Sequence, residues 1–136
     1  MEQEIIPDFI VIDDDRINNM ICLKIIELTI PGSSVKTFTE PGKGLEHILS
    51  TYSGNNARNA ILFLDINMPL LSGWDVLEHI NDFPAVVRER LKIFMLSSSV
   101  TPHDREQAED HPLVSGYIAK SLSQAKLKVI FPEYVT

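Results

Sequence analysis

Cysteine is almost absent from this 136-residue chain, which contains only Cys22. A single cysteine excludes an internal disulfide, and its scarcity is compatible with a reducing cytoplasm. The chain also lacks an apolar run long enough to span a membrane, and its start, MEQEIIPDF, lacks the basic and apolar segments of a signal peptide. We therefore expect a cytoplasmic protein with no membrane partner.

Positive charge is scarce as well. The chain has 12 Lys and Arg against 19 Asp and Glu, which gives a formal net charge of −7. This balance argues against nucleic acid as a partner, because contacts to phosphate backbones depend on basic side chains. It favours metal cations or basic protein surfaces instead.

Short apolar runs alternate with longer amphipathic segments along the chain. The apolar runs predict five strands, at residues 9–13, 34–38, 60–65, 92–99 and 116–120. The amphipathic segments predict helices at residues 15–30, 40–52, 72–82, 85–90, 101–110 and 123–131. Strands that alternate with helices imply an α/β fold with a parallel sheet and right-handed crossovers.

The first predicted helix has both a start signal and an apolar face. Asp15 is placed to cap the helix through its side chain. Apolar residues at helical spacing predict a stripe that faces the core, made of Ile17, Ile21, Ile25 and Leu28.

Polar and charged residues stand where the predicted strands end. Asp13 and Asp14 follow the first strand, Asp65 ends the third, Ser97 lies near the end of the fourth, and Lys120 ends the fifth. The carboxyl ends of parallel strands share one edge of the sheet, and ligands bind there. Clustered carboxylates repel one another, so a bound cation is expected among them.

Four sequence motifs at these strand ends occur in a familiar order. They are DDD after the first strand, LDINMPLLSGWDVL after the third, MLSSS at the fourth and GYIAK at the fifth. In this order they resemble a response-regulator receiver domain, the CheY-like phospho-acceptor of two-component signalling. The resemblance implies a flavodoxin-like three-layer sandwich with strand order 2-1-3-4-5. We expect one receiver domain over residues 1–136, with its core at about 8–131 and no output domain.

The resemblance also implies roles for the acidic residues. Asp65 matches the phospho-acceptor, and Asp14 matches a direct ligand of the metal beside it. The backbone carbonyl of Asn67 would complete the metal shell, and Asp13 would act through a water. The expected cofactor is Mg²⁺, with Mn²⁺ as an alternative, because such ions favour carboxylates, waters and phosphate oxygens.

Three further residues match the catalytic and switching positions of receivers. Ser97 and Lys120 would each contact an oxygen of the phosphoryl group, and Ser97 and Tyr117 would change position after its transfer. The resemblance makes a sensor histidine kinase or a histidine phosphotransfer protein the donor, and an unidentified protein the output partner. We expect a monomer or weak dimer that acts as a signalling domain and catalyses at most its own phosphorylation and dephosphorylation.

Other classes of function make different demands on the sequence. A haloacid-dehalogenase-type phosphatase needs an acid two residues after the nucleophile, where this chain has Asn67. A flavin or nucleotide binder needs a glycine- and hydroxyl-rich loop after the first strand, where three acids stand. A pseudo-receiver that binds partners without phosphorylation also remains open. Ser121 replaces the Pro that receivers usually have after the lysine, which leaves two loop geometries open, with a trans or a cis bond.

Overall fold

A five-stranded parallel sheet forms the centre of the computed structural model, which describes residues 5–98 and 101–135. The strands are β1 (Asp8–Ile12), β2 (Val35–Phe38), β3 (Ala60–Asp65), β4 (Leu91–Ser97) and β5 (Val114–Ala119). They lie in the order β2-β1-β3-β4-β5, and all neighbouring strands are parallel. The predicted doubly wound fold and its strand order are confirmed.

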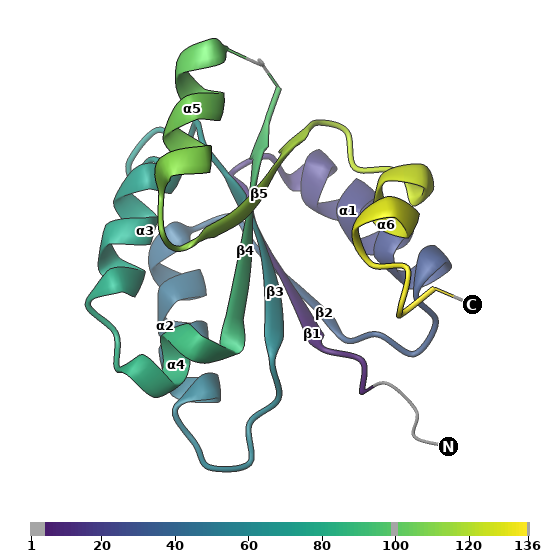
Figure 1. The fold of residues 1–136 in the computed structure, drawn as a ribbon, viewed down its shortest axis with the longest axis horizontal. Coiled ribbons are helices and arrows are strands. Elements are labelled where there is room, and N and C mark those ends of the chain that lie inside the picture. The colour runs from purple at the N-terminus through teal and green to yellow at the C-terminus, as the bar shows by residue number, and fades with distance from the viewer. Residues whose placement is uncertain (1–4, 99–100, 136) are drawn as a thin grey trace.

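Helices cover both faces of the sheet and complete three layers (Figure 1). One face carries α1 (Arg16–Thr29) and α6 (Gln124–Ile130). The other carries α2 (Pro41–Tyr52), α3 (Gly73–Asn81), α4 (Ala85–Arg90) and α5 (Pro102–Asp110). Within the described residues, none of these helices has the length and apolar content needed to cross a membrane.

The sheet separates two apolar cores. All six residues of β3 are buried, because helices pack on both of its faces. Leu62 belongs to the core beneath α2 to α5, together with Leu77 of α3. Phe63 faces the opposite core, where its ring lies edge-on to Phe131 at a centroid distance of 6.4 Å. Each large side chain buried in this way contributes about 1.5–3 kcal/mol relative to an exposed one.

The buried face of α1 differs from the predicted stripe. Ile17, Ile21 and Leu28 have exposed fractions of 70%, 39% and 67%. The residues of α1 that are buried instead are Asn18, Asn19, Cys22, Ile26 and Thr29. The predicted stripe was wrong at these three positions, whereas Ile25 is half-buried against the core. The amides of Asn18 and Asn19 turn the start of the helix toward the end of β1 instead. With Met20, the three exposed residues form what we call the α1 ridge.

The boundaries of two elements also differ from the predicted ranges. β4 ends at Ser97, and Ser99, the predicted end of that strand, lies outside the described residues. β5 runs from Val114 to Ala119, earlier than the predicted 116–120, whereas α2 ends at Tyr52, as predicted. The Arg90 guanidinium pins the end of α2 by donating to the Tyr52 carbonyl at 2.7 Å.

Candidate functional site

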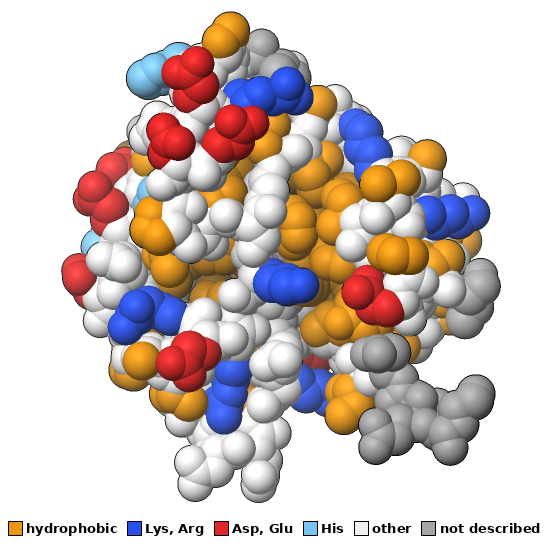
Figure 2. Space-filling model, viewed as in Figure 1, with side chains coloured by type: hydrophobic (Ala, Val, Ile, Leu, Met, Phe, Trp, Pro, Cys, Tyr) orange, Lys and Arg blue, Asp and Glu red, His pale blue; other side chains and the backbone are white. Residues whose placement is uncertain are grey.

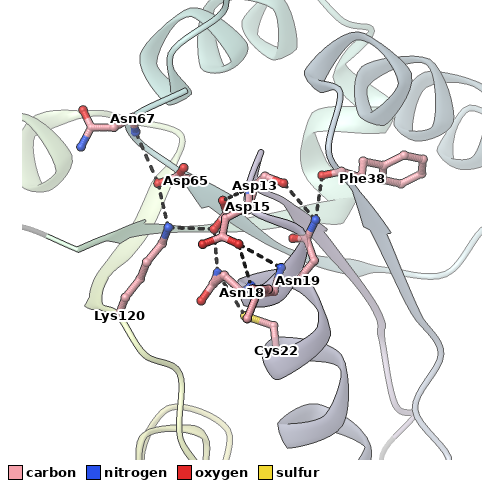
Figure 3. A network of polar contacts seen from close by, with 10 residues as sticks. Asp13, Asp15, Asn18, Asn19, Cys22, Phe38, Asp65, Asn67 and Lys120 are labelled. Carbon is pink, nitrogen blue, oxygen red and sulfur yellow. Dashed lines mark hydrogen bonds and ion pairs between the residues drawn. The ribbon is translucent and has the colours of Figure 1, made fainter. Parts of the chain in front are cut away.

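The carboxyl ends of four strands bring the predicted side chains to one edge of the sheet, and Figure 3 shows Asp13, Asp65 and Lys120 among them. Asp13 directly follows β1, Asp65 ends β3, Ser97 ends β4 and Lys120 directly follows β5. Asp13, Asp65 and Ser97 have exposed fractions of 0%, 3% and 0%. Buried polar groups of this kind need hydrogen-bonding or charged partners, because they have lost their contact with water.

Lys120 supplies the positive charge for both buried acids. Its Nζ lies 2.8 Å from Asp13 Oδ2 and 3.3 Å from Asp65 Oδ1. The backbone N–H of Lys120 donates to the Ser97 carbonyl at 2.9 Å and ties the end of β5 to that of β4. The lysine is therefore fixed both at its backbone and at its ammonium group.

Asp13 accepts more hydrogen bonds than the sequence indicated. Its Oδ1 accepts from the Asp15 backbone N–H at 2.9 Å, and its Oδ2 accepts from Asn18 Nδ2 at 2.6 Å. Asn19 Nδ2 donates to the Asp13 carbonyl at 2.9 Å. Neither asparagine was among the predicted site residues. The sequence did contain a signal for them, because two adjacent asparagines stand at the start of the helix that follows the strand-end acids.

Three acidic side chains converge at the edge. Carboxylate oxygens of Asp13, Asp14 and Asp65 lie within 4.8 Å of one another. Both oxygens of Asp13 already accept hydrogen bonds, whereas Asp14 is exposed. Asp15 instead caps α1, as predicted, by accepting from two backbone N–H groups. The three converging acids can hold a metal ion, because hard divalent cations bind carboxylate oxygens.

The loop after Asp65 is fixed at both of its ends. The Asn67 backbone N–H lies 3.4 Å from Asp65 Oδ1, and the Asn67 side chain points away from that acid (Figure 3). At the other end Ser72 and Asp75 form a capping box that starts α3. Gly73 packs against the strand so closely that a Cβ there would lie 2.5 Å from the Asp65 carbonyl oxygen.

The protonation of Asp65 reflects these surroundings. Burial and the negative charge of Asp13 raise the pKa of Asp65 to about 6, although Lys120 and the Asn67 N–H oppose the rise. Burial by itself lowers the pKa of Lys120, but its hydrogen bonds and ion pairs with Asp13 and Asp65 outweigh burial and raise it. At neutral pH the site therefore holds carboxylates beside an ammonium group.

The model of the response regulator receiver domain matches residues 9–131. The chain belongs to the response regulator receiver domain family. None of the curated proteins matches this sequence significantly.

Solved structures agree with the receiver assignment. A response regulator receiver protein from Dyadobacter fermentans is 29% identical, with 93% of this chain and 96% of that chain covered and a TM-score of 0.83. A two-component response regulator from Cytophaga hutchinsonii is 25% identical, with coverage of 96% and 98% and a TM-score of 0.85. Chemotaxis protein CheY4 from Vibrio cholerae shares the fold at 15% identity, with coverage of 96% and 100% and a TM-score of 0.70.

Two other features of this receiver domain bear on the sequence expectations. The Lys120–Ser121 peptide is cis, which is one of the two geometries that the sequence left open. Tyr117 lies on β5 beside Met95 of β4 and is half-buried against the core under α5. The predicted switch residues thus lie on adjacent strands, with Ser97 at the rim and Tyr117 in the interior of β5.

The raised pKa of Asp65 predicts a pH dependence of stability in metal-free protein. Because the folded-state pKa of about 6 exceeds the ordinary 3.8, the folded state binds more protons between these values. The contribution of this group is full below pH 4 and is lost as pH rises through 6, by about 2–3 kcal/mol. Urea unfolding should show wild type and Asp65→Asn diverging over this range. Parallel pH profiles for the two proteins would contradict the raised pKa.

Proposed function

We propose that this receiver domain accepts a phosphoryl group on Asp65 from a protein phosphohistidine in a Mg²⁺-dependent step, and that the transfer alters a partner-binding surface. The observation that carries the proposal is the setting of Asp65. It is a buried strand-end carboxylate that shares one oxygen between an ammonium group and a backbone N–H, beside two further acids. Phosphoryl transfer needs a nucleophile, a bound cation and a contact to the phosphoryl oxygens, and these groups can provide all three.

Asp65 serves as the nucleophile in this proposal. One carboxylate oxygen forms a bond to phosphorus while the bond from phosphorus to the donor's imidazole nitrogen breaks. The electron pair of the broken bond stays on that nitrogen, and an aspartyl phosphate remains on the receiver. With its pKa raised to about 6, Asp65 is mostly deprotonated at neutral pH and is able to attack.

The remaining groups hold the incoming phosphoryl oxygens. Asp14 and Asp65, with the Asn67 backbone carbonyl, would hold Mg²⁺ or Mn²⁺, and Asp13 would act through a water because both of its oxygens are engaged. When bound, the cation supplies positive charge that offsets the repulsion between the acids and the phosphoryl group. Lys120 can turn from Asp65 to a phosphoryl oxygen, since its Nζ already lies between the two acids.

The surface beside the site supports a protein donor. The α1 ridge exposes Ile17, Met20 and Ile21 directly after the acids of the β1 end. Exposed apolar rows on a helix are typical of surfaces that bind another protein. We infer that the ridge contacts helices of a sensor histidine kinase or phosphotransfer protein, in a cytoplasmic complex.

We expect the surface that binds the output partner to be formed by α5, β5 and α6, beside Lys120. After transfer Ser97 would move toward the phosphoryl group and Tyr117 would turn inward, because the two residues lie on neighbouring strands. The surface formed by α5, β5 and α6 would then present a different set of side chains to an output partner. Figure 2 shows apolar side chains in the hollow between β5 and α6.

Incubation with acetyl phosphate tests the proposal directly. Intact mass after acid quenching should show one phosphate adduct in the presence of Mg²⁺ and none when EDTA replaces the metal. Sustained release of phosphate from simple phosphate esters would point to a phosphatase instead. Absence of an adduct with acetyl phosphate and with any phosphohistidine donor would indicate a pseudo-receiver.

Thermal unfolding in the absence of a phosphoryl donor tests Mg²⁺ binding separately from phosphoryl transfer. Mg²⁺ that binds only the folded protein should raise the melting temperature as its concentration increases, since it offsets the repulsion of the acids. A melting temperature that does not respond to Mg²⁺ would count against a metal site.

A further inference from the structure

We propose that Lys126 is a positioning residue for the phosphoryl-transfer site, and that its ammonium group holds the loop that carries Lys120. This inference rests on the proposed function, because its consequence is the rate at which Asp65 is phosphorylated. Lys126 lies on α6, outside the motifs that identify the receiver domain, and no role follows for it from those motifs.

The Lys126 side chain contacts the backbone on both sides of Lys120. Its Nζ donates to the Ala119 carbonyl at 2.6 Å and to the Ser121 carbonyl at 2.8 Å. These carbonyls belong to the residues immediately before and after Lys120. One ammonium group therefore fixes the backbone on both sides of the residue that contacts the two buried acids. Hydrogen bonds from a charged donor are stronger than those between neutral groups.

The peptide between Ala119 and Lys120 is held at both of its edges. Its N–H, on Lys120, donates to the Ser97 carbonyl at 2.9 Å on the side of β4. Its carbonyl, on Ala119, faces the opposite side. β5 is an edge strand, so within the described residues no further strand supplies a donor on that side. The Lys126 ammonium supplies the hydrogen-bond donor that a neighbouring strand would otherwise provide to the Ala119 carbonyl.

The loop between β5 and α6, which carries Lys120, has few other contacts that hold it in place. Only residues 120–123 separate β5 from α6. Leu122 anchors the loop in the core at 3% exposure, and Ser123 caps α6 through the Lys126 backbone N–H. Neither contact fixes the direction in which the Lys120 side chain leaves the backbone. That direction depends on the peptides that flank Lys120, one of which carries the Ala119 carbonyl that Lys126 contacts.

Loss of the Lys126 ammonium should therefore move Lys120 without unfolding the protein. Misplacement of a reacting or charge-bearing group by about 1 Å can lower a rate about 100-fold, so we expect Lys126→Met to lower the rate of phosphorylation by acetyl phosphate at least about tenfold. Lys126→Arg should restore most of the rate, because a guanidinium also donates to two carbonyls. Mg²⁺ affinity should stay unchanged, since Lys126 contacts no acid of the metal site.

The control variant is Lys128→Met. Lys128 is an exposed lysine in the last turn of the same helix, so the substitution removes the same charge from α6 without touching the loop. It should retain the wild-type rate. A second measurement, the ¹³C chemical shift of Lys120 Cε in metal-free protein, reports the surroundings of that side chain without any phosphoryl donor. It should change in Lys126→Met and stay the same in Lys128→Met.

The possible outcomes separate this inference from the proposed function. A slower reaction and a shifted Lys120 signal in Lys126→Met, both restored by arginine, support the positioning role. An unchanged rate overturns it, and so does an equal loss of rate, Mg²⁺ affinity and melting temperature that arginine does not restore. If the wild-type protein takes no phosphoryl group, the proposed function fails. The Lys120 signal then decides alone whether Lys126 positions Lys120.

Discussion

Asp65→Asn is expected to abolish the phosphate adduct that the wild-type protein forms with acetyl phosphate and Mg²⁺. An amide has nearly the shape of a carboxylate, so the fold and the contacts of the β3 end should be retained. It offers no anionic oxygen to attack phosphorus, and no amide can replace that nucleophile. The effect should be a complete loss of adduct and not a reduced rate. Intact mass after acid quenching measures it directly.

Asp15→Asn is the matched control for this substitution. It makes the same change of carboxylate to amide two residues after Asp13, and asparagine is as good a helix cap as aspartate. Adduct formation should survive, because the Asp15 side chain caps α1 and does not face the pocket. An adduct that persists in Asp65→Asn would place the phosphoryl group on a different side chain and refute the assignment of Asp65.

Lys120→Met should affect both the chemistry and the stability of the protein. Removing one charged group that stabilises a developing charge in a buried site lowers rates about 10²- to 10³-fold, and a loss in that range is expected for phosphorylation. Asp13 and Asp65 would also lose the cation that lies 2.8 Å and 3.3 Å from their oxygens. Removing one partner of a buried ion pair costs about 3 kcal/mol or more, which urea unfolding at pH 7.5 would detect.

The pH dependence of this loss identifies its origin. Below pH 6 the Asp65 carboxyl can take a proton, so the missing ammonium should matter less and part of the stability should return. Lys43→Met provides the comparison, because Lys43 pairs with Glu40 at 3.0 Å on the exposed surface. Exposed ion pairs contribute little, so that variant should unfold like wild type. Equal stability of both variants at pH 7.5 would show that Lys120 does not compensate the buried acids.

The strand-end residues were predictable because their geometry follows from the fold class. Once five parallel strands are recognised, Asp13, Asp65, Ser97 and Lys120 must share one edge of the sheet. The strand order itself came from the resemblance, since hydrophobic patterns do not say which strands are neighbours. The Lys120 ammonium and the Asn18 amide explain why the buried acids tolerate such crowding, and these contacts could be read only from the structure.

Helix α1 shows where sequence patterns fail. Periodicity predicted that the row beginning at Ile17 faces the core, but only Ile25 of that row is half-buried. The buried face is selected by Asn18 and Asn19, whose amides donate to the Asp13 carboxylate and the Asp13 carbonyl. These contacts turn the polar start of the helix toward the sheet and leave the α1 ridge in solvent. Lys126 is equally hidden from sequence reasoning, because it lies outside the motifs and contacts only backbone carbonyls beside Lys120.

The pocket takes its groups from β1, β3, β4 and β5, and this has a consequence for damaged copies of the protein. Lys120 follows an edge strand, which has a neighbour on one side only. Heat, truncation or a destabilising mutation that loosens β5 would remove the ammonium group before the central strands separate. Such a molecule would retain much of its fold, but its buried acids would lack their counter-ion, and it would accept the proposed phosphoryl group poorly. Under the proposed function, errors of folding that loosen β5 should therefore lower the rate at which Asp65 is phosphorylated.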